Sequence, residues 1–172
     1  MIRVTNLYKS FGAVKAVQDV SFDAPDGLIT GLLGPNGAGK STTMRLIAGA
    51  LEPESGSAAI DGFETGRQRL EAQKRLGVLT DSHGLYLRLT ARENVRYFGQ
   101  LHGLRGKELE SRIDRLIELL DMTEIANRRT EGFSTGEQVK IAIARALVHQ
   151  PQNVMLDAPP AEPGIALWRF MI

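Results

Sequence analysis

The chain begins with alternating apolar and polar positions, which is the period of a half-buried β-strand. The apolar members of this alternation are Ile2, Val4, Leu7, Ala16, Val20 and Phe22. A break at Pro25-Asp26-Gly27 separates them from a short apolar run over residues 28–33, which we interpret as a further strand. Helical spacing follows over 44–51. The pattern predicts a β-rich start and then the order strand, glycine loop, helix.

The middle of the chain, about residues 81–133, is predicted to be helical. Thr90 and Glu93 have the spacing of a capping box, which opens a helix over about 91–102 with Val95 and Phe98 facing inward. One apolar stripe predicts a second helix. Its members are Leu109, Ile113, Leu116, Ile117 and Leu120.

Two shorter patterns complete the prediction. A hairpin-like stretch over 56–63 contains the turn dipeptide Asp61-Gly62. After Ser134 a helix is expected to continue to Val148 and to end before Pro151, and residues 153–156 are expected to form a buried strand.

Composition restricts the class of protein. A chain of 172 residues with 42% hydrophobic and 24% charged residues fits one globular domain. With a net charge of +1, the chain as a whole does not attract nucleic acid or anionic lipid. Any anion that it binds must therefore be bound by a local group of residues. The absence of cysteine excludes disulfides, thiol catalysis and cysteine-bound metal. With no apolar signal segment and no run of about 18 apolar residues, we expect a soluble, cytoplasmic chain.

The strongest chemical motif is GPNGAGKST, which fits the phosphate-binding pattern G-x-x-x-x-G-K-[ST]. Glycines let the backbone approach an anion, so that successive N–H groups and the helix N-terminus face the phosphates. The structural alternative is a glycine-rich turn before an amphipathic helix. The candidate phosphate-binding residues are Gly34, Pro35, Asn36, Gly37, Ala38, Gly39, Lys40, Ser41 and Thr42.

A second candidate phosphate contact is Phe133-Ser134-Thr135-Gly136-Glu137, which precedes a predicted helix. It brings a hydroxyl and a helix N-terminus to one place. The alternative is an ordinary capping box formed by Ser134 and Glu137.

The loop GPNGAGKST, the stretch FSTGEQVKIAIARAL and the run NVMLD, in this order, resemble the ATP-binding cassette (ABC) ATPases over residues 1 to about 157. Within that family, the amino-acid sequence is most similar to the Nat-type sodium-exporter ATPases. The resemblance implies an α/β P-loop NTPase core with an N-terminal antiparallel β region and an inserted α-helical subdomain, incomplete at the C-terminus. The chain would be one incomplete domain, 1–172, with its core at 1–80 and 136–172, a helical insert at about 81–135 and an atypical tail at 158–172.

The resemblance also implies roles for individual residues, with ATP and Mg²⁺ as cofactors. Phe11 would stack on adenine, although a core phenylalanine is the alternative. Lys40 would meet the β- and γ-phosphates. The signature residues, which would reach ATP bound by a second subunit, are Ser134, Thr135, Gly136 and Glu137, and the metal contacts are Ser41, Asp81 and Asp157.

The implied partners are a second ATPase subunit and a membrane protein. A homodimer or heterodimer would form through the nucleotide, and the segment after residue 81, through 91–102, would dock on a membrane-embedded subunit. A solvated amphipathic helix is compatible with this role. The chain would then be peripheral on the cytoplasmic face of the membrane.

The sequence departs from the family at sites that matter for chemistry. Asp81 stands where the family has glutamine, and Thr135 replaces the first glycine of the signature; we interpret both as tolerated. Ala158 stands where the family has the glutamate that polarises water, so no catalytic residue is intact. Removing a general base typically loses about 10²–10⁴ in rate, so ATP hydrolysis is expected to be absent.

The match also ends abruptly at residue 158. Residues 160–164 replace the family's dimer-contact loop, and no histidine follows His149; we interpret His83, His102 and His149 as structural or surface residues. A strand that separates the two motif strands in the family is missing, which would leave unpaired edges. A frameshift, an internal deletion or a truncated gene model is our hypothesis for this pattern, and a genuine tail remains the alternative.

Two readings of the function follow. The first is the ATP-binding subunit of an ABC transporter, which binds Mg-ATP weakly and couples dimer closure to a membrane partner, with sodium export expected from the resemblance. The second is a non-catalytic truncated remnant with no activity of its own. A GTPase would need an N-K-x-D motif, and a chromosome-type ATPase would need a long coiled coil; the chain has neither.

Overall fold

The structure is a computed structural model, and it describes residues 1–79 and 84–157. Asp81, His83 and the tail 158–172 therefore lie outside the described residues. The fold divides into two compact units, one formed by Met1–Leu76 with Asp157 and the other by Gly77–Leu156. Each unit is described by itself.

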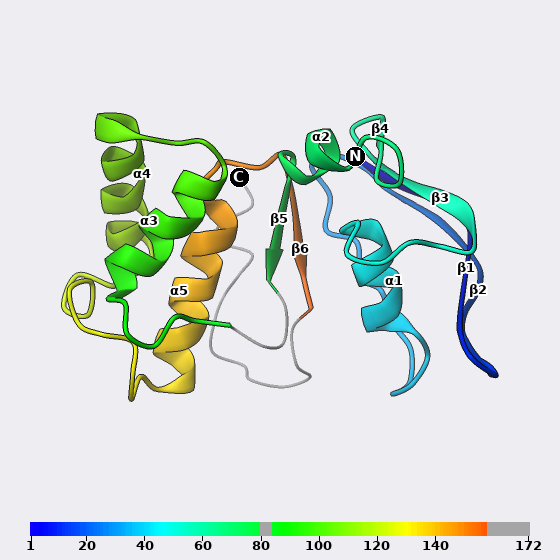
Figure 1. Ribbon diagram of the computed structural model, residues 1–172, viewed down its shortest axis with the longest axis horizontal. Coiled ribbons are helices and arrows are strands. Elements are labelled where there is room, and N and C mark those ends of the chain that lie inside the picture. Colours follow the sequence, from blue (N-terminus) through cyan, green and yellow to red (C-terminus); the bar gives the residue numbers. More distant parts are fainter. Residues whose placement is uncertain (80–83, 158–172) are drawn as a thin grey trace. The chain divides into compact units, whose positions relative to one another are not determined.

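The first unit contains the antiparallel sheet that the alternation predicts. Its strands lie in the order β2-β1-β3-β4, and every neighbouring pair is antiparallel. Figure 1 shows the helix α1 alongside this sheet. The elements are β1 (Ile2–Phe11), β2 (Val14–Ala24), α1 (Lys40–Ile47), β3 (Ser55–Ile60), β4 (Phe63–Glu64) and α2 (Arg69–Gln73).

A bulge in β1 explains why its buried positions do not alternate perfectly. Ile2, Val4 and Leu7 are buried, and the register with β2 shifts between Val4 and Leu7. Asn6 has φ 45° there, and its side-chain amide donates to Asp19 Oδ1 at 2.7 Å. The extra residue returns Leu7 to the core face of the sheet.

The prediction of a strand over residues 28–33 is wrong. The segment has no regular secondary structure, and Leu28, Ile29 and Leu33 are 65%, 71% and 92% exposed. A strand requires a hydrogen-bonded neighbour, and within residues 1–79 and 84–157 no strand pairs with this segment. The glycine loop and the helix that follow it are present as predicted.

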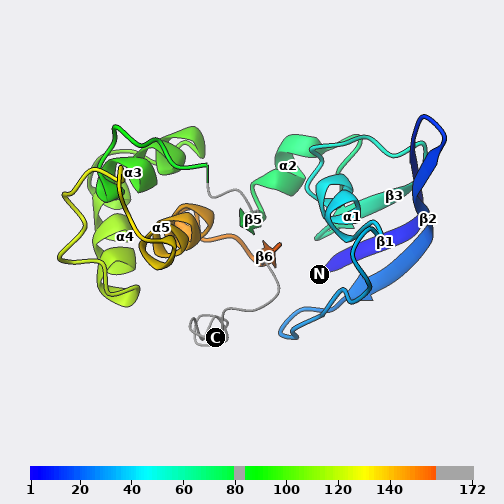
Figure 2. The ribbon, with the colours of Figure 1, turned by 90° about the horizontal axis from the view of Figure 1, so that it is seen from below.

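The second unit holds the helices, and both capping boxes and the apolar stripe are confirmed. Leu109, Ile113 and Ile117 are buried between the helices, which lie side by side in Figures 1 and 2. Strands β5 and β6 form a two-stranded sheet and run in the same direction in Figure 1. The elements are β5 (Leu76–Leu79), α3 (Ala91–Leu101), α4 (Gly106–Leu119), α5 (Thr135–Leu147) and β6 (Asn153–Leu156).

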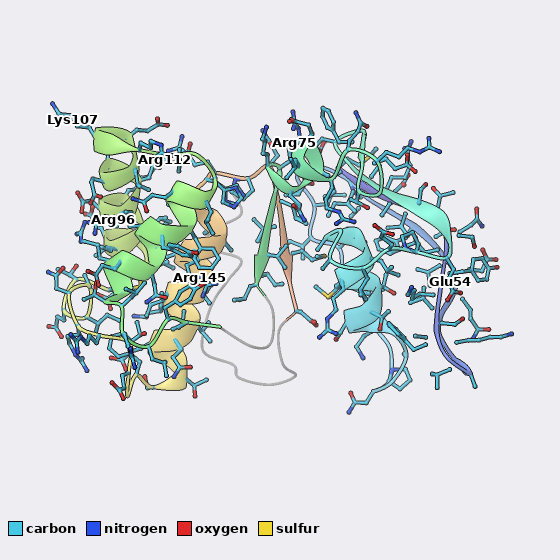
Figure 3. All side chains as sticks on the ribbon, in the orientation of Figure 1. Glu54, Arg75, Arg96, Lys107, Arg112 and Arg145 are labelled. Atoms are coloured by element: carbon cyan, nitrogen blue, oxygen red, sulfur yellow. The ribbon has the colours of Figure 1, made fainter. Side chains whose placement is uncertain are left out.

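Ion pairs fasten α3 to α4. Arg96, labelled in Figure 3, donates from Nε and Nη2 to the two oxygens of Glu110 at 2.6 and 2.9 Å. Arg92 Nη1 lies 2.7 Å from Asp114 Oδ1. In the described part of the chain, no helix is long and apolar enough to cross a membrane.

Candidate nucleotide-binding site

The phosphate loop has the backbone conformation that its glycines permit. Gly37 and Gly39 have φ 80° and 84°, in the left-handed region that favours glycine. Gly39 is the N-cap of α1, and no side chain caps that end of the helix. The backbone N–H groups of the first turn therefore lack a side-chain acceptor, which is the arrangement by which such loops bind phosphate.

Lys40 reaches back over the loop that precedes it. Its ammonium group donates to the carbonyl oxygens of Gly34 and Pro35, both at 2.8 Å. Thr43, one turn further along α1, donates from its hydroxyl to the Gly39 carbonyl at 3.0 Å. The loop thus closes on itself around the lysine, with the positive charge at the start of the helix.

Ser41 and Asp157, separated by 116 positions, come together within the first unit. The Ser41 hydroxyl donates to Asp157 Oδ1 at 3.5 Å. Hydroxyl and carboxylate oxygens are suitable ligands for Mg²⁺, which is usually held by one or two carboxylates together with substrate phosphates and water. Over residues 1–79 and 84–157, no cluster of three or more His, Cys, Asp or Glu could hold a metal by itself. The predicted contact Asp81 lies outside the described residues.

Phe11, the candidate adenine contact, is not a core residue. It ends β1 with half of its surface exposed, and the Lys9 ammonium lies 5.7 Å from its ring centroid. An exposed aromatic face beside a cation is available for stacking with a purine.

The signature residues lie at the start of α5. Ser134 is the N-cap, and its side chain and that of Glu137 form a reciprocal capping box. Ser134, Thr135 and Gly136 are exposed, whereas the preceding Phe133 is buried and anchors the turn. Hydrogen bonds from the Ser134 amide and hydroxyl, with Arg128 and Lys140 nearby, lower the pKa of Glu137.

The segment around Tyr86, which follows the undescribed residues 80–83, is held in place by hydrogen bonds to buried polar side chains. The sequence analysis did not identify these side chains as candidate site residues. The amide of Asn94, which is completely buried, donates to the Tyr86 carbonyl at 3.1 Å, and its oxygen accepts from the Tyr86 N–H at 2.9 Å. Thr130 also donates to the Tyr86 carbonyl, at 3.1 Å. The only sequence signal was a polar residue, Asn94, next to Val95 on the inward face of a predicted helix.

Arg145 connects α5 to the same segment. Its side chain is labelled in Figure 3. The guanidinium donates to the Gly84 carbonyl at 3.0 Å and lies 3.6 Å from the centre of the Phe98 ring on α3. Phe98 in turn packs edge-on against Tyr97, with ring centroids 5.6 Å apart. The exposed Tyr86 and Tyr97 therefore pack against Phe98, which Arg145 covers from α5.

Two of the three histidines form a pair. The rings of His102 and His149 stack with centroids 3.6 Å apart and planes 3° from parallel. Partial burial of its ring lowers the pKa of His102, although the residue as a whole is among the exposed ones. This pairing agrees with a structural interpretation of both residues.

Comparison with known proteins places this geometry in a family. Residues 17–161 match the sequence model of the family described as "ABC transporter". The chain therefore belongs to the ABC transporter family and carries its ATP-binding domain. Its α/β fold is that of the family's ATPase cassettes.

Individual relatives make the resemblance more specific. The chain is 46% identical to the ABC transporter ATP-binding protein NatA of Bacillus subtilis, over 92% of the chain and 67% of that protein. It is 36% identical to the linearmycin resistance ATP-binding protein LnrL of the same organism, over 92% of the chain and 51% of that protein. The first value agrees with the predicted Nat-type resemblance. The chain spans about half to two thirds of the length of these curated relatives.

Solved structures agree. An ATP-binding subunit of an ABC transporter superposes with a TM-score of 0.82 at 28% identity, covering 91% of this chain and 65% of that one. The dimeric cassette MJ0796 bound to ADP and Pi gives a TM-score of 0.80 at 27% identity, over 91% of this chain and 73% of that one.

Proposed function

We propose that the chain is the ATP-binding subunit of an ABC transporter and that it binds Mg-ATP through residues 34–42. The observation that carries the proposal is the loop itself: two left-handed glycines and a lysine lead into an α1 N-terminus that no side chain caps. Lys40 would contact the β- and γ-phosphates, Ser41 and Asp157 would contact Mg²⁺, and Phe11 would stack on adenine. Asp81 would complete the metal site.

The nucleotide would be shared with a second ATPase subunit. Ser134, Thr135, Gly136 and Glu137 would contact the phosphates of ATP bound by the partner, in a homodimer or a heterodimer. The exposure of Ser134 and Gly136 supports this arrangement, because a second molecule has access to them. In this reading the chain is a single ATPase domain with its core at 1–80 and 136–172 and a helical insert at about 81–135.

ATP-driven closure would act on a membrane-embedded subunit that docks on the segment after residue 81, through residues 91–102. The exposure of Tyr86 and Tyr97, which pack against Phe98, supports this assignment. The chain would be peripheral on the cytoplasmic face of the membrane. Sodium export is the transport reaction that the relation to NatA suggests.

Hydrolysis by this chain is expected to be deficient because Ala158 stands at the position of the general base. Alanine has no acceptor for the proton of the attacking water. Binding would persist, because the phosphate loop supplies most of the contacts.

Thermal unfolding with and without Mg-ATP tests the binding. A ligand that binds only the folded state raises the midpoint, and a concentration of 100 times Kd adds about 2.7 kcal/mol to the free energy of unfolding. We expect a shift for the native chain and none for Lys40→Ala. No shift for the native chain would instead favour the second reading, a truncated remnant without activity.

A further inference from the structure

The carboxylate of Glu137 accepts from both hydrogen-bond donors of Ser134 in the free chain. One oxygen, Oε2, accepts from the Ser134 backbone N–H and from the Ser134 hydroxyl, each at 2.8 Å. In return the Glu137 N–H donates to Ser134 Oγ at 3.3 Å. The second oxygen, Oε1, lies 3.5 Å from Arg128 Nη1.

This arrangement conflicts with the contact that the signature would make with ATP. A serine hydroxyl has one proton to donate. While that proton is directed at Glu137, it is not available to a phosphate oxygen. Because the carboxylate is ionised at neutral pH, it also places a negative charge at the end of α5 that an incoming phosphate would approach.

We propose that Glu137 competes with the nucleotide phosphate for Ser134 and so restrains the association of two ATPase subunits. The proposal rests on the proposed function, which assigns Ser134 to ATP bound by the partner. Arg128 places a positive charge beside the Glu137 carboxylate. Its guanidinium lies 5.1 Å from the centre of the buried Phe133 ring. A phosphate that displaces the Ser134 hydroxyl from Glu137 would leave the carboxylate with the Ser134 N–H and Arg128 as its partners.

The chain contains a matched control for this idea. At the start of α3, Thr90 and Glu93 form the same kind of capping box, in which the Thr90 N–H donates to Glu93 Oε2 at 2.8 Å and the Glu93 N–H donates to Thr90 Oγ1 at 3.1 Å. The pKa of Glu93 is likewise lowered by its hydrogen bonds to Thr90. Thr90 has no assigned contact with nucleotide, so glutamine at position 93 reports only the effect of a neutral cap.

The experiment measures self-association of the full chain by sedimentation, with Mg²⁺ and a non-hydrolysable ATP analogue, for the native chain, Glu137→Gln, Glu93→Gln and Lys40→Ala. Glutamine preserves a capping box, so both glutamine variants are expected to fold. We expect Glu137→Gln to raise the nucleotide-dependent association constant about two- to fivefold, which is the range for one charge at a helix end. Glu93→Gln should leave it unchanged, and Lys40→Ala should abolish the nucleotide-dependent part.

The outcomes separate the two proposals. Equal association of the native chain and Glu137→Gln, with a normal response to Lys40→Ala, would overturn the competition and leave the proposed function standing. An equal gain in Glu93→Gln would also overturn it, because the effect would then belong to capping in general. Binding of the analogue without association in any variant would overturn the shared nucleotide site and the competition with it.

Discussion

Gly39 lies so close to the main chain of Ala16 that a Cβ atom at position 39 would overlap the Ala16 carbonyl oxygen. Ala16 belongs to β2, so this contact fixes the end of the phosphate loop against the antiparallel sheet. Gly39 also has φ 84°, which side chains rarely adopt. Glycine is therefore required here by the fold of the chain as well as by any phosphate.

Gly39→Ala should lower the stability of the chain. A residue forced into the left-handed region costs on the order of 1–3 kcal/mol, and relief of the overlap with Ala16 must displace α1 or β2. Urea unfolding measures the loss. Gly66→Ala is the control, because a Cβ at position 66 would meet nothing within 4 Å and Gly66 has no positive φ; an equal loss in both variants would contradict the role of Ala16.

Gly136→Ala should have opposite effects on the free energy of unfolding and on nucleotide-dependent association. Gly136 lies in the first turn of α5, and a Cβ there would meet nothing within 4 Å. Alanine favours helix over glycine by up to about 1 kcal/mol, so the free energy of unfolding should rise slightly. If a second subunit's nucleotide approaches this turn, the nucleotide-dependent association constant should fall. Unchanged association would argue against a close approach at Gly136.

The stability of the chain should decrease as the pH falls below 6.5. Burial lowers the pKa of His102 in the folded state from its ordinary value of 6.5, so the unfolded chain takes up the proton first. The loss begins below 6.5 and levels off below the folded pKa.

Urea midpoints at pH 7.5, 6.5 and 5.5 measure this dependence. His102→Phe keeps a ring against His149 and removes the titrating group, so its midpoint should change less over this range. The carboxylates with lowered pKa, which are Glu71, Glu93, Glu110 and Glu137, titrate below their ordinary value of 4.5 and leave this window unaffected. The same slope in both proteins would contradict an effect of His102.

Restoring a carboxylate at position 158 should restore hydrolysis. The native chain should release no phosphate from ATP above the level of Lys40→Ala. Ala158→Glu should raise the rate of ATP hydrolysis, by up to the factor of about 10²–10⁴ that a general base contributes. If the double variant with Ala158→Glu and Lys40→Ala releases no phosphate, the gained hydrolysis belongs to this nucleotide site. A rate in the native chain that depends on Lys40 would contradict the predicted deficiency.

Features with local causes could be predicted from the sequence. The capping boxes at Thr90 and Ser134 depend on residues three positions apart, and the stripe from Leu109 to Leu120 depends on helical periodicity; both are present in the structure. The phosphate loop could be predicted for the same reason, because Gly37 and Gly39 determine its backbone locally.

Features that depend on distant partners could not be predicted. The apolar run 28–33 has the composition of a strand, but a strand forms only when another strand pairs with it. The stack of His102 on His149 and the contacts of Asn94 with Tyr86 arise from the packing of helices and loops, which no short-range spacing encodes.

The exposed run 28–33 also determines how the purified chain will behave. It contains no charge and no proline, and three of its large side chains are mostly exposed. Exposed segments of this kind pair between molecules at high concentration, so we expect the run to promote association of the purified chain. We therefore expect some association without nucleotide, and only the part that requires Lys40 reports on a shared phosphate.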